Sequence, residues 1–307
     1  LMEETDVVAG WVSKLRARLL GRAMAKSVLP TRAVPIRGWG MLLLVLACPA
    51  AGTEPPPLQM GVLPYLSSER LFKNFLPMKQ YLEARLGRRV IMSTAPNFKT
   101  YLQRAARGDY DIYQTAPHFA LLAETEYGYR RVGRFTRELS GDVIVRRDAS
   151  LRRIEDLRGQ IVICPDALAI TSLLGEQLLQ EHGLLPGRDY RIERSTSHNN
   201  ALWTVYRRQA AAALTSAAVF EQLPPDIRRE LRVLAKTREV PHMMVMAHPR
   251  LSQSEYEHLQ SSLLAFSRTD AGRNFFESTG YGGMVPISDL DMKRLRPFLR
   301  HLKEHVQ

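Results

Sequence analysis

The sequence predicts an α/β fold of two lobes, each built on a mixed, mostly parallel sheet covered by helices. From residue 58 onward, short apolar segments alternate with longer segments whose apolar residues recur at helical spacing, as in βα units. The alternation runs through two series, and a later apolar segment over 240–247 returns to the first. We therefore expect one lobe over 53–138 plus 240–307, a second over 139–239, and strands that cross between them.

Local patterns place the elements of the first lobe. Gly87 and Gly108 stop helices, and Pro117 suits a first helical position. Pro77 lies inside the first expected helix, so that helix either starts there or is kinked. We expect strands over 58–63, 89–94 and 110–115, and helices over 71–86, 97–107 and 117–126.

The second series follows the same rules, and Gly183 closes its longest helix. We expect strands over 142–146, 160–164, 190–194 and 211–215, and helices over 154–157, 168–182, 199–208 and 216–223. The return strand over 240–247 is followed by three helices, over 254–267, 271–278 and 287–305. Two such series with a late return indicate two lobes.

The first 52 residues read as a secretory signal peptide. The apolar run Met41–Ala47 is preceded by Lys26, Arg32 and Arg37 with no acid among them, and small residues follow it. The run is too short to anchor the chain in a bilayer. Because Leu1 is not a start residue, we expect that the reading frame before Met24 is over-called. The mature chain then starts near residue 53 and is periplasmic, or lipid-anchored through Cys48, since Val45–Cys48 resembles a lipobox; a buried N-terminal helix is the third reading.

Composition excludes some classes of protein. The chain has 307 residues, of which 45% are hydrophobic and 24% charged, so disorder and collagen-like repeats are excluded. The net charge is +12, which suits anionic partners in general. The arginines are scattered, so we expect a basic surface and no nucleic acid partner. No nucleotide loop, GxSxG or HExxH motif or zinc cysteine pair is present, so we expect no enzyme, cofactor or metal.

Four expected strand-to-helix junctions carry small or hydroxyl residues. Such residues cap helices, and the free N–H groups of a helix N-terminus attract anions. In open parallel sheets, ligands lie at the carboxyl ends of the strands. If the lobes face each other, the four junctions converge on one cleft and bind a small anion; otherwise each hydroxyl is only a cap. The junctions are Thr115–His118, Ala169–Ser172, Ser195–His198 and Thr215–Ser216.

Several segments resemble the periplasmic phosphate/phosphite/phosphonate-binding proteins of ABC transporters, over about 58–290. They are Gly61–Tyr65, Gly108–Phe119, Asp142–Asp148, Ile154–Gly159 and Ser195–His198. The resemblance implies a type II periplasmic binding protein fold, closure about a hinge, and a solute-binding protein that captures a small oxyanion ligand for an ABC permease in the inner membrane.

The resemblance also implies ligand-binding residues. Tyr65 matches a ligand tyrosine, and His198 matches a histidine that opens a helix of the second lobe. His118 is expected from its place at a helix start, where it could donate to an anion. The six positions expected to bind ligand are thus Tyr65, Thr115, His118, Thr171, Ser172 and His198. The sequence departs from the family at Ala116, at Ala169–Ile170, and at Ala212–Ala213, where an acid is often found. Loss of that acid favours an anion other than an aminoalkyl phosphonate.

Three alternatives remain open. Cys164 is either a small core residue or a soft ligand, for example of arsenite, in a sensor that signals to a membrane histidine kinase. Besides a transport protein and a sensor, an enzyme on the same fold is the third class of function that remains open. The segment His242–His248 hints at copper, but strand alternation favours core methionines.

Overall fold

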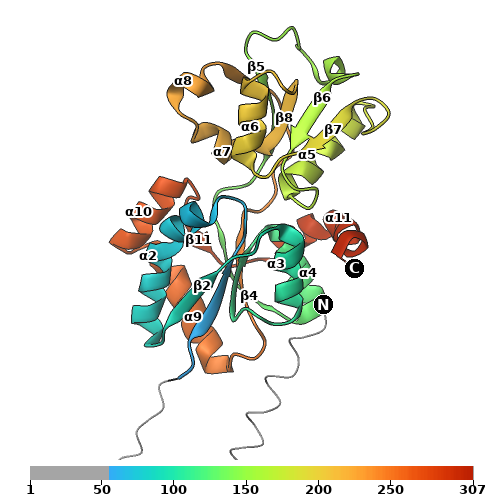
Figure 1. Ribbon diagram of the computed structural model, residues 1–307. Helices are drawn as coiled ribbons and strands as arrows, with labels where there is room; N and C mark the ends of the chain where they lie inside the picture. Colours follow the sequence, from blue (N-terminus) through green and yellow to red (C-terminus); the bar gives the residue numbers. More distant parts are fainter. Residues whose placement is uncertain (1–54, 307) are drawn as a thin grey trace, which may run out of the picture. The chain divides into compact units, whose positions relative to one another are not determined.

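The computed structural model describes residues 55–306 (Figure 1). The expected signal peptide, Cys48 and the start of the mature chain lie outside these residues. Within the described part of the chain, no helix combines the length and the apolar character needed to cross a membrane.

The first lobe contains a six-stranded sheet of order β11-β4-β10-β3-β1-β2. Its strands are β1 (Leu58–Val62), β2 (Val90–Ser93), β3 (Ile112–Thr115), β4 (Arg130–Phe135), β10 (Met244–Ala247) and β11 (Met284–Val285). Strands β2, β1 and β3 pair in parallel, whereas β10 pairs antiparallel with both β3 and β4. The late strand therefore lies inside the sheet, between strands from the first half of the chain.

Helices cover both faces of this sheet (Figure 1). Helices α2 (Ser68–Leu86), α9 (Gln253–Phe266) and α10 (Asp270–Thr279) pack together on one face. Helices α3 (Phe98–Ala106), α4 (Pro117–Tyr127) and α11 (Asp289–Val306) pack together on the other. Because both faces are covered, all four residues of β3 are buried, as expected for a central strand.

The second lobe contains a five-stranded sheet of order β7-β6-β8-β5-β9. Its strands are β5 (Gly141–Arg146), β6 (Ile161–Cys164), β7 (Arg191–Arg194), β8 (Ala212–Ser216) and β9 (Leu231–Lys236). Its helices are a short 3₁₀ turn (Ile154–Leu157), α5 (Ile170–Glu181), α6 (His198–Tyr206), α7 (Ala217–Glu221) and α8 (Pro225–Arg228). Val143 and Val145 face one hydrophobic core and Ile144 the other, as the two-residue period of a strand requires.

Two chain segments cross between the lobes and contact each other. Leu139 and Val240 form an isolated antiparallel pair in which each N–H donates to the other's carbonyl, at 2.8 and 2.9 Å. The first segment then enters β5, and the second leads into β10. This pair joins the two sheets at the point where the sequence predicts a hinge.

The predicted α/β fold with two sheets is confirmed, with local differences. Strands β4, β9 and β11 were not expected: the sequence of β4, RRVGRF, is half arginine, that of β9, LRVLAK, does not alternate regularly, and β11 has only two residues. The return strand begins at Met244 because residues 240–243 form the crossing. Helix α2 continues through Pro77 rather than starting there.

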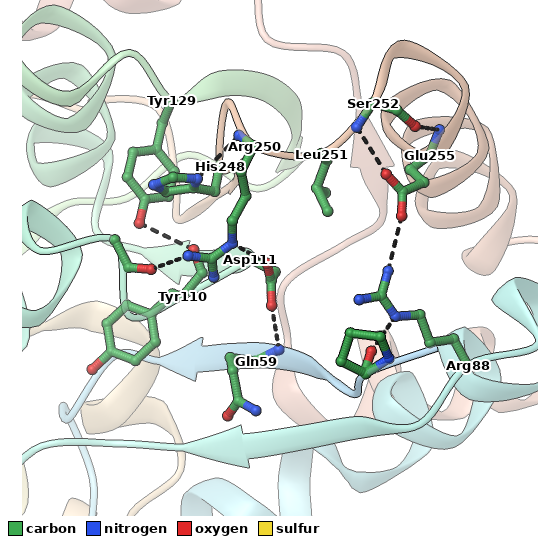
Figure 2. A network of polar contacts seen from close by, with 12 residues as sticks. Gln59, Arg88, Tyr110, Asp111, Tyr129, His248, Arg250, Leu251, Ser252 and Glu255 are labelled. Atoms are coloured by element: carbon green, nitrogen blue, oxygen red, sulfur yellow. Dashed lines mark hydrogen bonds and ion pairs between the residues drawn. The ribbon is translucent and has the colours of Figure 1, made fainter. Parts of the chain in front are cut away.

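A polar network ties β1 to the segment after β10 (Figure 2). Asp111 accepts a hydrogen bond from the Gln59 backbone N–H at 2.7 Å and pairs with Arg250. Arg250 also donates to the Gly108 carbonyl, and its own backbone N–H donates to His248. Since Asp111 is 6% exposed, its carboxylate is desolvated and depends on these partners.

We expect Asp111→Ala to lower the free energy of unfolding by about 1–3 kcal/mol, because it leaves the Gln59 N–H without its acceptor and Arg250 without its anion. Urea unfolding measures this change. Asp109→Ala is the matched control: its pair with Arg107 is exposed, so the cost should stay below about 1 kcal/mol. Equal losses in the two variants would contradict a structural role for the buried carboxylate.

Candidate functional site: a cleft between the lobes

A small cavity lies where the two lobes meet. Each of the four predicted junctions contributes at least one lining residue: Ala116, Ala169 to Thr171, His198 and Ser216. Its volume is about 50 Å³. Since a water molecule needs about 10–15 Å³ of such volume, the cavity has room for roughly three to five water-sized atoms. The junctions therefore converge on a space about as large as a small oxyanion.

Thr171 lies in the first turn of α5 and lines the cavity. It is 2% exposed, and its Oγ1 has no hydrogen-bond partner in the protein. The preceding N-cap residue is Ala169, which has no side chain able to cap the helix. Gly141 permits this arrangement, because a Cβ there would lie 2.9 Å from the Thr171 carbonyl oxygen. A buried, unpaired hydroxyl at an uncapped helix start is a feature that a ligand can satisfy.

His198 opens α6 and also lines the cavity. Its Nδ1 lies 3.1 Å from the Thr215 Oγ1 and accepts a hydrogen bond from the Ser216 backbone N–H at 3.4 Å, a group that can only donate. In the neutral ring, the proton is therefore on Nε2, which becomes a donor. Burial lowers the pKa of His198 to about 4, so the ring is neutral at pH 7. His198 can donate one hydrogen bond to a ligand but brings no charge.

Three polar side chains that were not expected to bind ligand also line the cavity, namely those of Tyr281, His242 and Gln222. The hydroxyl of Tyr65, a residue that was expected to bind ligand, forms a short hydrogen bond with the hydroxyl of Tyr281. The ring of His242 lies 5.1 Å from that of Tyr281. Its Nδ1 is buried without a partner, and burial lowers its pKa to about 3. Gln222 completes the set from the end of α7.

The remaining wall is apolar, and no Lys, Arg, Asp or Glu lines the cavity among the described residues. Leu63, Phe98, Ile170, Val219 and Met243 are among the apolar lining residues. The groups available to an anion are thus helix N-termini, hydroxyls and neutral imidazoles. In a site that excludes water, such dipoles interact more strongly with an anion than they do in bulk solvent.

The other three expected residues lie next to the cavity without lining it. Thr115 is fully buried at the end of β3, and Ser172 lies against the Cys164 thiol. The Nε2–H of His118 donates a hydrogen bond to the Leu168 carbonyl at 2.8 Å and so connects α4 of the first lobe to the second lobe. Burial lowers its pKa to about 3. The structure therefore brings Tyr65, Thr171 and His198 together at the cavity, and places His118 at a contact between the lobes.

Two alternative interpretations of single residues are resolved by position. Cys164 is fully buried in a core of the second lobe, and burial raises the pKa of its thiol to about 11. Met244 and Met246 are fully buried in the core of the first lobe, so the core interpretation is confirmed. In the described part of the chain, no group of three His, Cys, Asp or Glu could hold a metal ion.

The family profile for the periplasmic substrate-binding protein of phosphonate ABC transporters matches residues 60–292. The chain belongs to this family. Members of the phosphonate-binding family are transport proteins that bind a substrate in the periplasm, which agrees with the predicted class. No curated protein matches the sequence.

Solved structures confirm the type II periplasmic binding protein fold. PhnD1 from Prochlorococcus marinus, in complex with methylphosphonate, gives a TM-score of 0.73 at 15% identity, over 82% of this chain and 100% of that one. A binding protein component of an ABC phosphonate transporter from Pseudomonas aeruginosa gives 0.72 at 16% identity, over 82% and 89%. The alkanesulfonate-binding protein SsuA from Xanthomonas axonopodis gives 0.57 at 17% identity, over 82% and 94%.

We expect acid to destabilise this phosphonate-binding family member through its buried histidines. The folded-state pKa values of His118, His198 and His242 lie at about 3 to 4, below the ordinary 6.5 of the unfolded chain. The unfolded chain therefore binds protons first as pH falls below 6.5, and stability is lost down to about pH 3–4. Each histidine contributes about 2 kcal/mol of loss between pH 6.5 and 5.

Urea unfolding at pH 7.5, 6.5 and 5 measures this loss. His242→Gln should reduce the loss by roughly one histidine's share, about 2 kcal/mol. His258→Gln, on the exposed face of α9, should leave it unchanged. A free energy of unfolding that is flat between pH 6.5 and 5 would show that the three rings are not held neutral by the fold.

Proposed function

We propose that this protein captures a small phosphonate-like or phosphate-like oxyanion in the cleft between its lobes and delivers it to an ABC permease. The observation that carries the proposal is the unpaired, buried hydroxyl of Thr171 at an uncapped helix start, in a cavity on which four junctions converge. The protein acts by binding, without turnover, and works in the periplasm as its family does.

The cavity can replace the hydration shell of an anion with fixed dipoles. The first N–H groups of α5 lack intrahelical partners, and the helix dipole adds positive potential there. Around this terminus, the Thr171 hydroxyl and the His198 Nε2–H can donate to oxygens of the ligand, and the one O–H that the Tyr65–Tyr281 pair leaves free can donate a further hydrogen bond. Because none of these groups is charged, the site suits a compact anion that accepts several hydrogen bonds.

The positions at which members of the family often carry an acid, which could pair with an amine of the ligand, are occupied in this chain by buried apolar residues. Ala212 and Ala213 are fully buried in the two cores of the second lobe, and no carboxylate lines the cavity. An ammonium group in this cavity would have no carboxylate to pair with and would lose its hydration without compensation. We therefore favour an unsubstituted or alkyl-substituted oxyanion over an aminoalkyl phosphonate.

The arsenite sensor alternative gains no support from the site. Cys164 faces a core, contacts Arg194 and Glu193, and does not line the cavity. A thiol with a raised pKa is also a poor ligand at neutral pH. Neither the family nor its structural relatives point to a histidine kinase.

We expect methylphosphonate, phosphite or phosphate to raise the melting temperature of the mature chain, residues 53–307, with sulfate and arsenite as comparison anions. A ligand at 100 times its dissociation constant stabilises by about 2.7 kcal/mol. Thr171→Val should weaken binding about tenfold or more, because it removes a donor from the cavity. The same variant without ligand should be at least as stable as wild type, since an unpaired buried hydroxyl costs about 1–3 kcal/mol.

Thr204→Val is the matched control, because it makes the same change in α6 outside the cavity. Its affinity should equal that of wild type. If no phosphorus oxyanion shifts the melting temperature, or if Thr171→Val binds as tightly as wild type, the proposed site is wrong.

A further inference from the structure

A second pocket adjoins the cavity and shares Leu66 with it. The first lobe contributes Leu66, Ser67 and Arg70 from the start of α2, and the second lobe contributes Thr196, Ser197 and Asn199 around the start of α6. This pocket is open and larger, at about 340 Å³. Apart from Leu66, the residues that line this pocket are polar, whereas most of those that line the inner cavity are apolar.

Three polar side chains of this outer pocket have no partner among the described residues. Among the described residues, Arg70 forms no ion pair or hydrogen bond, Ser67 does not cap α2 with its hydroxyl, and the Asn199 amide is also unpaired. By contrast, Thr196 and Ser197 are engaged by Asn200, through its side-chain amide and its backbone N–H respectively. The guanidinium of Arg70 is thus an available cation in a pocket with no Asp or Glu in its lining.

Arg70 is also electrostatically connected to the inner cavity. Its positive charge opposes the effect of burial on the pKa values of Tyr65 and Tyr281, two residues that line that cavity. Burial is the larger effect and raises both pKa values. The charge of Arg70 is therefore felt at the tyrosine pair, although its side chain lines only the outer pocket.

We propose that the outer pocket binds a carboxylate carried by the ligand, so that the preferred ligand is a phosphonocarboxylate with a short apolar linker. This inference rests on the proposed function, which places the oxyanion head in the inner cavity. The linker would pass Leu66, and the carboxylate would pair with the Arg70 fork while Ser67 and Asn199 donate to it.

The charge pattern favours a carboxylate over other substituents. An ammonium substituent would meet Arg70 and no acid in either lining. A purely apolar substituent would leave Arg70, Ser67 and Asn199 in contact with solvent only, and would gain nothing from them. A planar carboxylate matches the two parallel N–H bonds that a guanidinium offers.

The test is titration calorimetry of the mature chain with methylphosphonate, phosphonoacetate, 3-phosphonopropionate and 2-aminoethylphosphonate. At least one phosphonocarboxylate should bind about fivefold or more tightly than methylphosphonate, and the aminoalkyl compound should bind more weakly. In Arg70→Gln this gain should disappear, so that the ratio of phosphonocarboxylate affinity to methylphosphonate affinity falls to about one. Lys73→Gln removes the same charge one turn further along α2 and outside the pocket, and should keep the gain.

The possible failures are distinguishable. If methylphosphonate binds but neither phosphonocarboxylate binds more tightly, the outer subsite is wrong and the proposed function stands. A gain that survives in Arg70→Gln, or is lost equally in Lys73→Gln, also overturns the subsite, because net charge alone then explains it. If no phosphonate binds, the proposed function fails, and the subsite fails with it.

Discussion

The pair of backbone hydrogen bonds between Leu139 and Val240 is the constraint on which the arrangement of this protein depends. The chain leaves the first lobe through Leu139 and returns through Val240, and the two crossings are held side by side. On the ligand side of this pair, Leu139 itself lines the cavity, and His242 follows two residues after Val240. The crossing segments therefore also form part of the wall of the cavity, so a change of backbone geometry at this pair would alter the cavity directly.

A second contact between the lobes is apolar. Leu168, Ala169, Ile170 and Leu174 of the second lobe belong to the same hydrophobic cluster as the core of the first. The His118 bond to the Leu168 carbonyl lies at this contact. The start of α5 thus has two tasks: its apolar side chains pack against the first lobe, and Thr171 in its first turn faces the cavity. The absence of a capping side chain at Ala169 serves both, since a polar cap would be buried in the apolar contact.

Sequence reasoning could identify the fold and the general location of the site, because both follow from periodicity and from the strand-to-helix junctions. The sequence did not determine which side chain at each junction lines the cavity. Thr115 was expected to bind ligand, yet the next residue, Ala116, lines the cavity, because adjacent residues at the end of a strand point in opposite directions. Likewise Thr171 lines the cavity and Ser172, about 100° further around the helix, faces Cys164.

His242 and Tyr281 could not be found in this way, because neither lies at a strand-to-helix junction. His242 belongs to a crossing segment that the sequence predicted as ordinary strand, and Tyr281 follows α10 in a loop. Both reach the cavity only because β10 and β11 pair with β4, a strand that was itself missed. The one available signal was the histidine that precedes three methionines, and its methionines drew attention to a metal instead.

The basic composition and the uncharged cavity are reconciled by where the arginines are used. Many arginines of the described chain donate to backbone carbonyls or pair with surface acids: Arg146 bonds the Tyr206 carbonyl, Arg147 the Arg229 carbonyl, and Arg294 the Glu239 carbonyl. These cations hold loops and helix ends together at the surface. Their summed field can raise the local concentration of anions and speed association, but it falls off within about 10 Å at 0.1 M salt. Selection among anions must then come from the dipoles inside the cavity and, in the subsite that we propose, from Arg70 in the adjoining pocket.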